Sequence, residues 1–332
     1  MVGTSLPSTS LPKSASLTDA FISPSTRLVD QREFRQLRRD FECELGEAAG
    51  PLPANERVRV DAYHLRNSIS GNVEPDGSFR WTPWTARRPI GIECVRACLA
   101  NPRLTPLQAT HDVITRLVGR AVDERQRPGS LAEWLSGLGV GGRAVVQAEA
   151  VVWATQLQTA LDWSRIDRPI VGRDHSVVLP TSSQVLLRGR IEVQSRASSL
   201  GPLNKGKSGD TRDVSPAVLF SIMTGRPTPT ARTELGLAAL TVALDDRHGE
   251  SPTRVVGWWP QSGRALVVPV DLALLGQTCE AVVAAVRSAR PARPRQLRSS
   301  RKRTTEFGEA KRQHSAPRAL TGPVVDVERA AS

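Results

Sequence analysis

Lysine is scarce in this sequence: five of its 45 basic residues are Lys, and the other 40 are Arg. The formal net charge is +12 over 332 residues. Arg keeps its charge under ordinary conditions and binds phosphate through two parallel hydrogen bonds. The charge therefore favours an anionic partner, with DNA or RNA as the first expectation. A coding bias toward Arg, Ala, Gly and Pro gives the same Arg to Lys ratio and remains an open alternative.

Cysteine is scarce as well, with four in the chain: Cys43, Cys94, Cys98 and Cys279. They do not form two C-x-x-C pairs, which argues against a zinc ribbon, and we expect small buried side chains. The N-terminus lacks the basic and apolar segments of a secretory signal. The sequence has no run of about 18 apolar residues, so it does not predict a membrane span. We therefore expect a cytoplasmic protein without a membrane partner.

Several catalytic signatures are also absent. The chain has no G-x-x-x-x-G-K-[ST] sequence, which excludes a P-loop, and no G-x-S-x-G nucleophile elbow. Its five His are scattered, without H-x-x-x-H or H-E-x-x-H spacing. These absences remove the nucleotide-hydrolysing P-loop class and the common zinc peptidase motif from consideration.

Composition divides the chain into three parts. Residues 1–29 are rich in Ser, Thr and Pro and are expected to be disordered. Residues 30–286 are expected to form one domain, with a helical part at 30–165 and a sheet-containing core at 166–286. Residues 287–332 are expected to be a disordered basic tail, which begins with eight basic residues and no acidic one in 17 positions.

The helical part has clear start signals. Asp30 and Glu33 form a capping-box pattern, and Thr105 precedes a Pro at the first position of a second helix. Residues 143–161 are apolar nearly all round, which predicts a helix inside the fold. Residues 47–90 are expected to be irregular because PLP, EPDG and WTPW interrupt any period.

The core alternates between strand and helix patterns. Its period predicts strands at 175–180, 184–196, 217–222, 253–259 and 264–270, and helices at 230–246 and 271–286. This order predicts an α/β fold with a mixed sheet flanked by helices. We expect 185–195 and 217–223 to be adjacent antiparallel strands in its centre.

Three segments of the core stand in the order of a known set of motifs: RGRIE at 188–192, LFSIMTGRP at 219–227 and ELGLAAL at 234–240. In order and spacing they resemble the PD-(D/E)XK nuclease superfamily, in its RecB-like branch, over about residues 80–286. The resemblance implies a restriction-endonuclease-like mixed sheet with a helical N-terminal part. In an active member it also implies Mg²⁺, which carboxylates from adjacent strands bind.

The catalytic positions of that pattern are changed in this chain. Glu192 stands where the family has Asp, and it is the one expected metal ligand that keeps a carboxylate. Ser221 stands at the second carboxylate, and Met223 stands at the lysine. Glu234 replaces Gln, and Ala238 replaces Tyr on the following helix. The resemblance therefore implies an impaired catalytic site.

Other residues offer partial replacements. Glu149 can supply a helix carboxylate near the metal, and Lys205 or Lys207 can supply a cation if the insert that holds them folds back. In a purely structural interpretation, Glu192 pairs with Arg188, Arg190 or another nearby Arg.

The sequence therefore favours a catalytically impaired nuclease-fold protein with a nucleic-acid-binding or scaffolding role. The expected nucleic-acid contacts are Arg188, Arg190, Arg226, Arg298, Arg301, Lys302 and Arg303. One alternative is an active Mg²⁺-dependent DNA nuclease that uses Glu149, Glu192 and a relocated cation. Another is a protein-interaction module whose basic tail docks an acidic protein partner.

A further stretch, WTPWTARRPIG at 81–91, places two Trp beside two Arg. It fits either a phosphate-and-base surface or cation–π packing in a loop, and we expect packing.

Overall fold

The computed structural model describes residues 17–23, 29–50, 57–71, 80–122, 128–180, 184–196, 215–247 and 250–289. All of them belong to one compact unit, Met1–Pro291. Most of the predicted N-terminal segment, and all of the tail beyond residue 289, lie outside the described residues, so those predictions remain untested.

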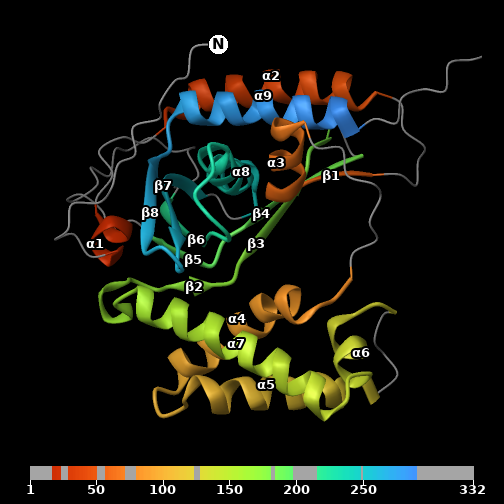
Figure 1. Cartoon of the computed structure of the whole chain (residues 1–332). Helices are drawn as coiled ribbons and strands as arrows, with labels where there is room; N and C mark the ends of the chain where they lie inside the picture. Colours follow the sequence, from red (N-terminus) through yellow and green to blue (C-terminus); the bar gives the residue numbers. More distant parts are fainter. Residues whose placement is uncertain are drawn as a thin grey trace, which may run out of the picture. The chain divides into compact units, whose positions relative to one another are not determined.

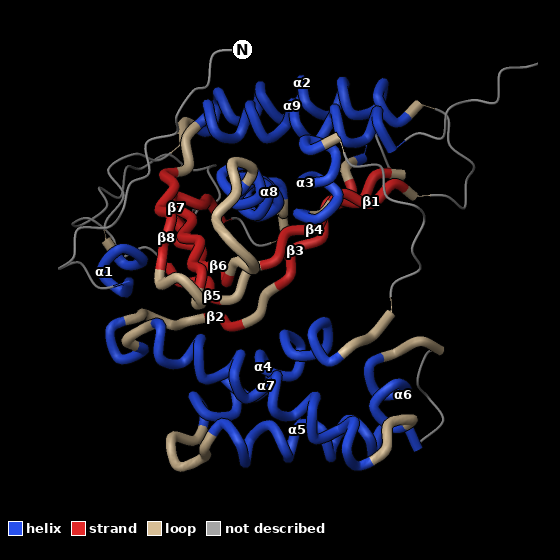
Figure 2. The backbone as a smooth tube through the Cα atoms, viewed as in Figure 1, coloured by secondary structure: helices blue, strands red, loops and turns tan. Residues whose placement is uncertain are grey.

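The predicted helices and strands appear in the predicted order, and the structure adds further ones among them (Figures 1 and 2). The helices are α1 (Leu17–Ile22), α2 (Gln31–Ala49), α3 (Ala62–Ser70), α4 (Pro83–Ala100), α5 (Pro106–Val122), α6 (Leu131–Ser136), α7 (Val140–Ala160), the short 3-10 helix η1 (Trp163–Arg165), α8 (Ala231–Leu244) and α9 (Leu272–Ala289). The strands are β1 (Val58–Val60), β2 (Ile170–Val171), β3 (Asp174–Val178), β4 (Val185–Arg190), β5 (Val193–Arg196), β6 (Ser215–Ile222), β7 (Glu250–Trp259) and β8 (Arg264–Pro269).

Within the described residues the strands form two sheets. The larger has the order β2-β5-β6-β7-β8, and the smaller has the order β1-β4-β3. Strand β6 is antiparallel to β5 and parallel to β7, and helix α8 makes the crossover between the parallel pair. Strand β8 returns antiparallel to β7. The predicted α/β fold with a mixed sheet flanked by helices is confirmed.

Alternate residues of β6 enter different hydrophobic clusters, because side chains along a strand point to opposite faces. Leu219 packs with residues of α2, α8 and α9, whereas Val218 and Phe220 pack with residues of α1, α4 and α7. The larger sheet is therefore covered by helices on both faces (Figure 2). A third cluster joins α4 and α7 to α5 and α6.

The predicted central hairpin is partly right. Residues 193–196 of β5 pair antiparallel with 217–220 of β6. Residues 185–190 instead form β4, which pairs with β3 and β1 in the smaller sheet. The strand is interrupted at Ile191 and Glu192, so one predicted strand serves both sheets.

Three other predictions need correction. Helix α1 lies inside the segment expected to be disordered. It is ordered because Phe21 is fully buried and contacts Phe220 edge-on. The stretch 47–90 is not irregular throughout, since it contains β1, α3 and the start of α4. Helix α7 is not buried all round: Val145 and Val152 are about half exposed, at 54% and 55%.

Helix α9 bears on the expectation that nothing spans a membrane. Its 18 residues have a mean hydropathy of 1.2, so by length and composition it meets the requirements for a span, and the sequence prediction missed this. In the structure α9 packs against α2 and α8, and Leu274, Val282 and Val286 are buried. A core helix of a globular domain has the same composition, so α9 is weak evidence for a membrane.

Candidate functional site

The interruption between β4 and β5 fixes Glu192 at the centre of the predicted catalytic region. Its backbone N–H donates to the carbonyl of Phe220 at 3.0 Å, and its carbonyl accepts from Gly172 at 2.7 Å. Its carboxylate Oε2 accepts from the backbone N–H of Ile222 at 2.9 Å, and the residue is only 3% exposed. Glu192 therefore lies beside the Ser221–Met223 segment, as the resemblance implies.

The partner of this carboxylate is an arginine from the helical part. Arg88, on α4, donates from Nε to Oε1 of Glu192 at 2.6 Å and from NH2 to Oδ1 of Asp174 at 2.7 Å. Arg188 donates to the other oxygen of Asp174 at 2.9 Å. Arg190 pairs opposite Asp174 in the smaller sheet. We call Arg88, Asp174, Arg188, Arg190 and Glu192 the Arg88 cluster.

Charges in the Arg88 cluster shift its titration. Burial alone lowers the pKa of Arg88, but the carboxylates of Glu192 and Asp174 outweigh it and raise that pKa above its ordinary value. Burial likewise raises the pKa of Asp174, but Arg88 and then Arg188 outweigh it and hold that pKa below 3.8. Loss of hydration, followed by repulsion from Arg88, lowers the pKa of Arg190. Arg88 and Arg190 both remain cationic at neutral pH.

The Arg88 cluster holds three cations against two carboxylates, and its donors are not all used. The Nε of Arg188 is buried and has no hydrogen-bond partner among the described residues. Arg190 is partly exposed, and its guanidinium is close enough to Arg88, Asp61 and Asp174 to interact electrostatically with them. Within the described part of the chain, no ion pair is formed by Arg190. A buried donor without a partner costs free energy, so this site favours an anion that supplies acceptor oxygens.

Of the two positions where the resemblance implies a second carboxylate and a lysine, Ser221 lies beside the Arg88 cluster and Met223 packs in the core. Ser221 is 6% exposed, and its hydroxyl donates to the carbonyl of Arg190 at 3.2 Å. Met223 donates from its backbone to Trp258 at 2.7 Å, and its side chain packs against the α2–α8–α9 core next to Gly257. Met223 is thus an ordinary apolar side chain at the end of β6.

The helix that follows also uses its substituted residues structurally. Arg66, on α3, donates to both carboxylate oxygens of Glu234, at 2.8 and 2.5 Å, and Thr230 donates to Oε1 at 2.8 Å. Ala238 is buried where α8 packs on β4: a Cβ built at Gly189 comes within 3.2 Å of the Cα of Ala238. The small residues at 189 and 238 therefore allow helix and strand to approach closely.

The other sequence-predicted residues are dispersed. Glu149, on α7, is 41% exposed and lies 3.6 Å from Arg87, so it and Glu192 bind different arginines of α4. Arg226 is exposed in the turn after β6, where Gly225 has a positive φ of 73°. Lys205 and Lys207 lie outside the described residues. So do the four tail residues, Arg298, Arg301, Lys302 and Arg303.

The Arg88 cluster does not fit a Mg²⁺ site. Mg²⁺ needs several oxygen ligands in octahedral geometry. Both oxygens of Glu192 accept hydrogen bonds, from Arg88 and from a backbone amide, and both oxygens of Asp174 accept from guanidinium groups. A divalent cation there would lie beside the Arg88 charge. The hydroxyl of Ser221 donates to the carbonyl of Arg190.

Sequence reasoning missed Arg88, Asp174 and Arg66. The notable signal for Arg88 was its place in WTPWTARRPIG, which forms the start of α4 with Thr82 as N-cap and Pro83 in its first turn. Nothing in the local sequence marked Asp174 or Arg66, because their partners are 14 or more residues away along the chain.

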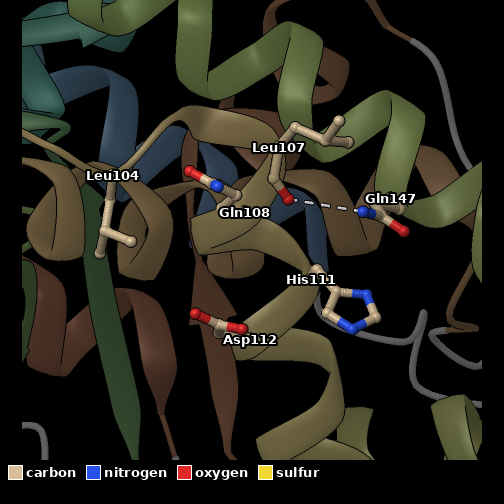
Figure 3. A pocket seen from close by; sticks show the side chains of 6 residues that line it. All are labelled: Leu104, Leu107, Gln108, His111, Asp112 and Gln147. Carbon is tan, nitrogen blue, oxygen red and sulfur yellow. Dashed lines mark hydrogen bonds between the residues drawn. The ribbon is translucent and has the colours of Figure 1, made fainter.

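A surface pocket of about 520 Å³ lies elsewhere, between α5 and α7 (Figure 3). Its lining residues are Leu104, Leu107, Gln108, His111, Asp112 and Gln147. Gln147 donates to the carbonyl of Leu107 at 3.5 Å, which links the two helices across it. No residue of the Arg88 cluster lines this pocket. The lining mixes apolar and polar side chains and does not suggest a reaction.

No protein-family model matches this chain, and a search of curated proteins finds no match either.

Proposed function

We propose that this protein is a catalytically impaired member of the PD-(D/E)XK nuclease superfamily that binds nucleic acid through phosphate contacts at the Arg88 cluster. One observation carries the proposal. The guanidinium group of Arg88 binds Glu192 and Asp174 where the resemblance implies a metal ion. Beside it, Arg188 keeps a donor without a partner, and Arg190 forms no ion pair within the described residues.

The sheet supports the family interpretation. Strands β5, β6 and β7 form an antiparallel pair followed by a parallel pair with a crossover helix. Glu192 lies in the interruption just before β5, and Ser221 lies on β6. The chemistry supports the loss of catalysis. A nuclease of this kind needs a metal ion and a cation beside the attacked phosphate, whereas this chain has Arg88 between the carboxylates and a thioether at 223.

The charge of the Arg88 cluster supports binding. A phosphate diester supplies acceptor oxygens to Arg190 and to the exposed part of the Arg188 guanidinium, and it offsets the excess positive charge. Such contacts are independent of sequence and release counterions, so affinity should fall steeply with salt concentration. A scaffolding protein without a nucleic-acid partner would leave these donors unused.

The test measures binding and cleavage in the same samples. The affinity for labelled oligonucleotides is measured by fluorescence anisotropy at several salt concentrations between about 50 and 200 mM. The change of log affinity with log salt concentration is the salt slope. Arg190→Gln should weaken binding and reduce that slope by about one, because one phosphate contact is lost. Arg264→Gln, at the exposed start of β8, is the matched control and should leave both quantities unchanged.

Cleavage is followed with Mg²⁺ and with Mn²⁺ on single- and double-stranded DNA. We expect binding without cleavage. Metal-dependent cleavage that Glu192→Ala abolishes would instead support the active nuclease, and absence of binding by the unmodified protein would contradict the proposed function.

A further inference from the structure

We infer that Trp84 is a base-stacking platform beside the Arg88 cluster, so that the site takes single-stranded nucleic acid in preference to duplex. This inference rests on the proposed function and adds the class of ligand.

The ring of Trp84 is both exposed and held. It lies in the first turn of α4 and is 49% exposed. The guanidinium carbon of Arg87 lies 3.0 Å from the ring centroid, and Arg87 is in turn 3.6 Å from Glu149 on α7. One face of the indole is therefore covered by a cation that is itself anchored, and the exposed surface is available to a planar ligand. Little rotamer freedom is lost when a base stacks on a ring that is already fixed.

The helix places this ring next to the Arg88 cluster. Residues 84 and 88 are four apart on α4, so their side chains lie on the same side, about 6 Å apart at Cβ. Arg88 points to the sheet, where it binds Glu192, and Arg87 points to α7, where it approaches Glu149. In the helical period the direction of Trp84 falls between those of Arg87 and Arg88, one turn nearer the start of α4.

The combination selects for unpaired bases. Arg188 and Arg190 recognise phosphate in any strand, whereas an aromatic face gains contact only with a base whose own face is free. In a duplex the bases are stacked on one another and offer edges in the grooves. A single strand lets the phosphates bind the Arg88 cluster while a nearby base stacks on Trp84.

The experiment compares ligands that differ in one feature at a time. Anisotropy titrations of the full chain use a single-stranded DNA oligonucleotide, the same length of RNA, the duplex, and an abasic oligonucleotide with the same phosphates and no bases. The unmodified protein should prefer both single strands to the duplex and should bind the abasic strand about tenfold more weakly than the normal one. The DNA and RNA arms decide which single strand it takes.

Variants locate the effect. Trp84→Ala should bind the single strand about tenfold more weakly and leave duplex affinity, abasic affinity and the salt slope unchanged, while Trp84→Phe should keep most of the affinity. Leu107→Ala, which removes an apolar side chain that is 59% exposed on α5, is the matched control. The melting temperature of each variant is measured alongside, and the abasic comparison needs no variant.

The inference is overturned if the unmodified protein binds normal and abasic strands equally, if it prefers duplex, or if Trp84→Ala binds as the unmodified protein does. In these cases nucleic-acid binding that depends on Arg190 would leave the proposed function intact. Absence of binding to all four ligands would overturn both.

Discussion

The Nε atom of Arg88 lies 2.6 Å from Oε1 of Glu192, although 104 residues separate the two in sequence. The contact joins α4 of the helical part to the strand interruption of the sheet-containing core. It also gives Glu192, the remaining expected metal ligand, a fixed positive charge as its partner. Stability and the state of the candidate site thus depend on the same ion pair.

The first prediction concerns this ion pair. Arg88→Ala should destabilise the fold by about 3 kcal/mol, because it leaves the buried carboxylate of Glu192 without a cation and removes one of two cations from the half-buried Asp174. The free energy of unfolding from urea titration measures the effect. Arg264→Ala is the surface control and should change stability by less than about 0.5 kcal/mol. If both variants lose a similar amount of unfolding free energy, the ion pair of Arg88 contributes no more to stability than an ordinary surface residue.

The second prediction concerns acid. Arg88 and Arg188 hold the pKa of Asp174 below its ordinary value of 3.8, so the folded state binds that proton less tightly than the unfolded state. The stabilisation is fully present above about pH 4 and is lost as the pH falls through the lowered folded-state pKa. The difference in unfolding free energy between the unmodified protein and Asp174→Asn should therefore shrink below pH 4. A difference in unfolding free energy that stays constant down to about pH 2 would contradict the ion-pair assignment.

The third prediction concerns the contact of α8 with β4. A Cβ at Gly189 would lie 1.9 Å from Oγ1 of Thr241 and 3.2 Å from the Cα of Ala238. Gly189→Ala should therefore cost about 1–3 kcal/mol, since the helix backbone must move. Gly141→Ala, on α7 with nothing within 4 Å of the new Cβ, is the control and should be neutral or stabilising by up to about 1 kcal/mol. Equal thermal shifts in the two variants would contradict the close approach.

The fourth prediction concerns repair of the substituted catalytic positions. Ser221→Asp combined with Met223→Lys should give no Mg²⁺- or Mn²⁺-dependent cleavage of DNA, because Arg88 still binds Glu192 and Asp174. It should also lower stability, since the new ammonium group enters the apolar packing of Met223 near Gly257. Cleavage by this double variant that Glu192→Ala abolishes would show that Arg88 does not block the site.

From the sequence one could predict most of the core elements and, through the resemblance, an altered motif. Periodicity and capping residues act within a few positions, so α2, α5, α8, α9 and strands β6, β7 and β8 could be predicted locally. The residues at 192, 221 and 223 can be compared with the motif that they resemble without a structure, and the comparison predicts that a carboxylate and a lysine are missing.

Only the folded chain shows which side chains meet the carboxylates of the candidate site. The partners of Asp174, Glu192 and Glu234 are arginines that no local period identifies, because an ion pair forms wherever the fold brings two side chains together. The same limit explains the split of 184–196 into two strands and the exposed side of α7. A pattern of apolar residues predicts that a segment can be buried, but the number of elements packed around it determines how much of it is.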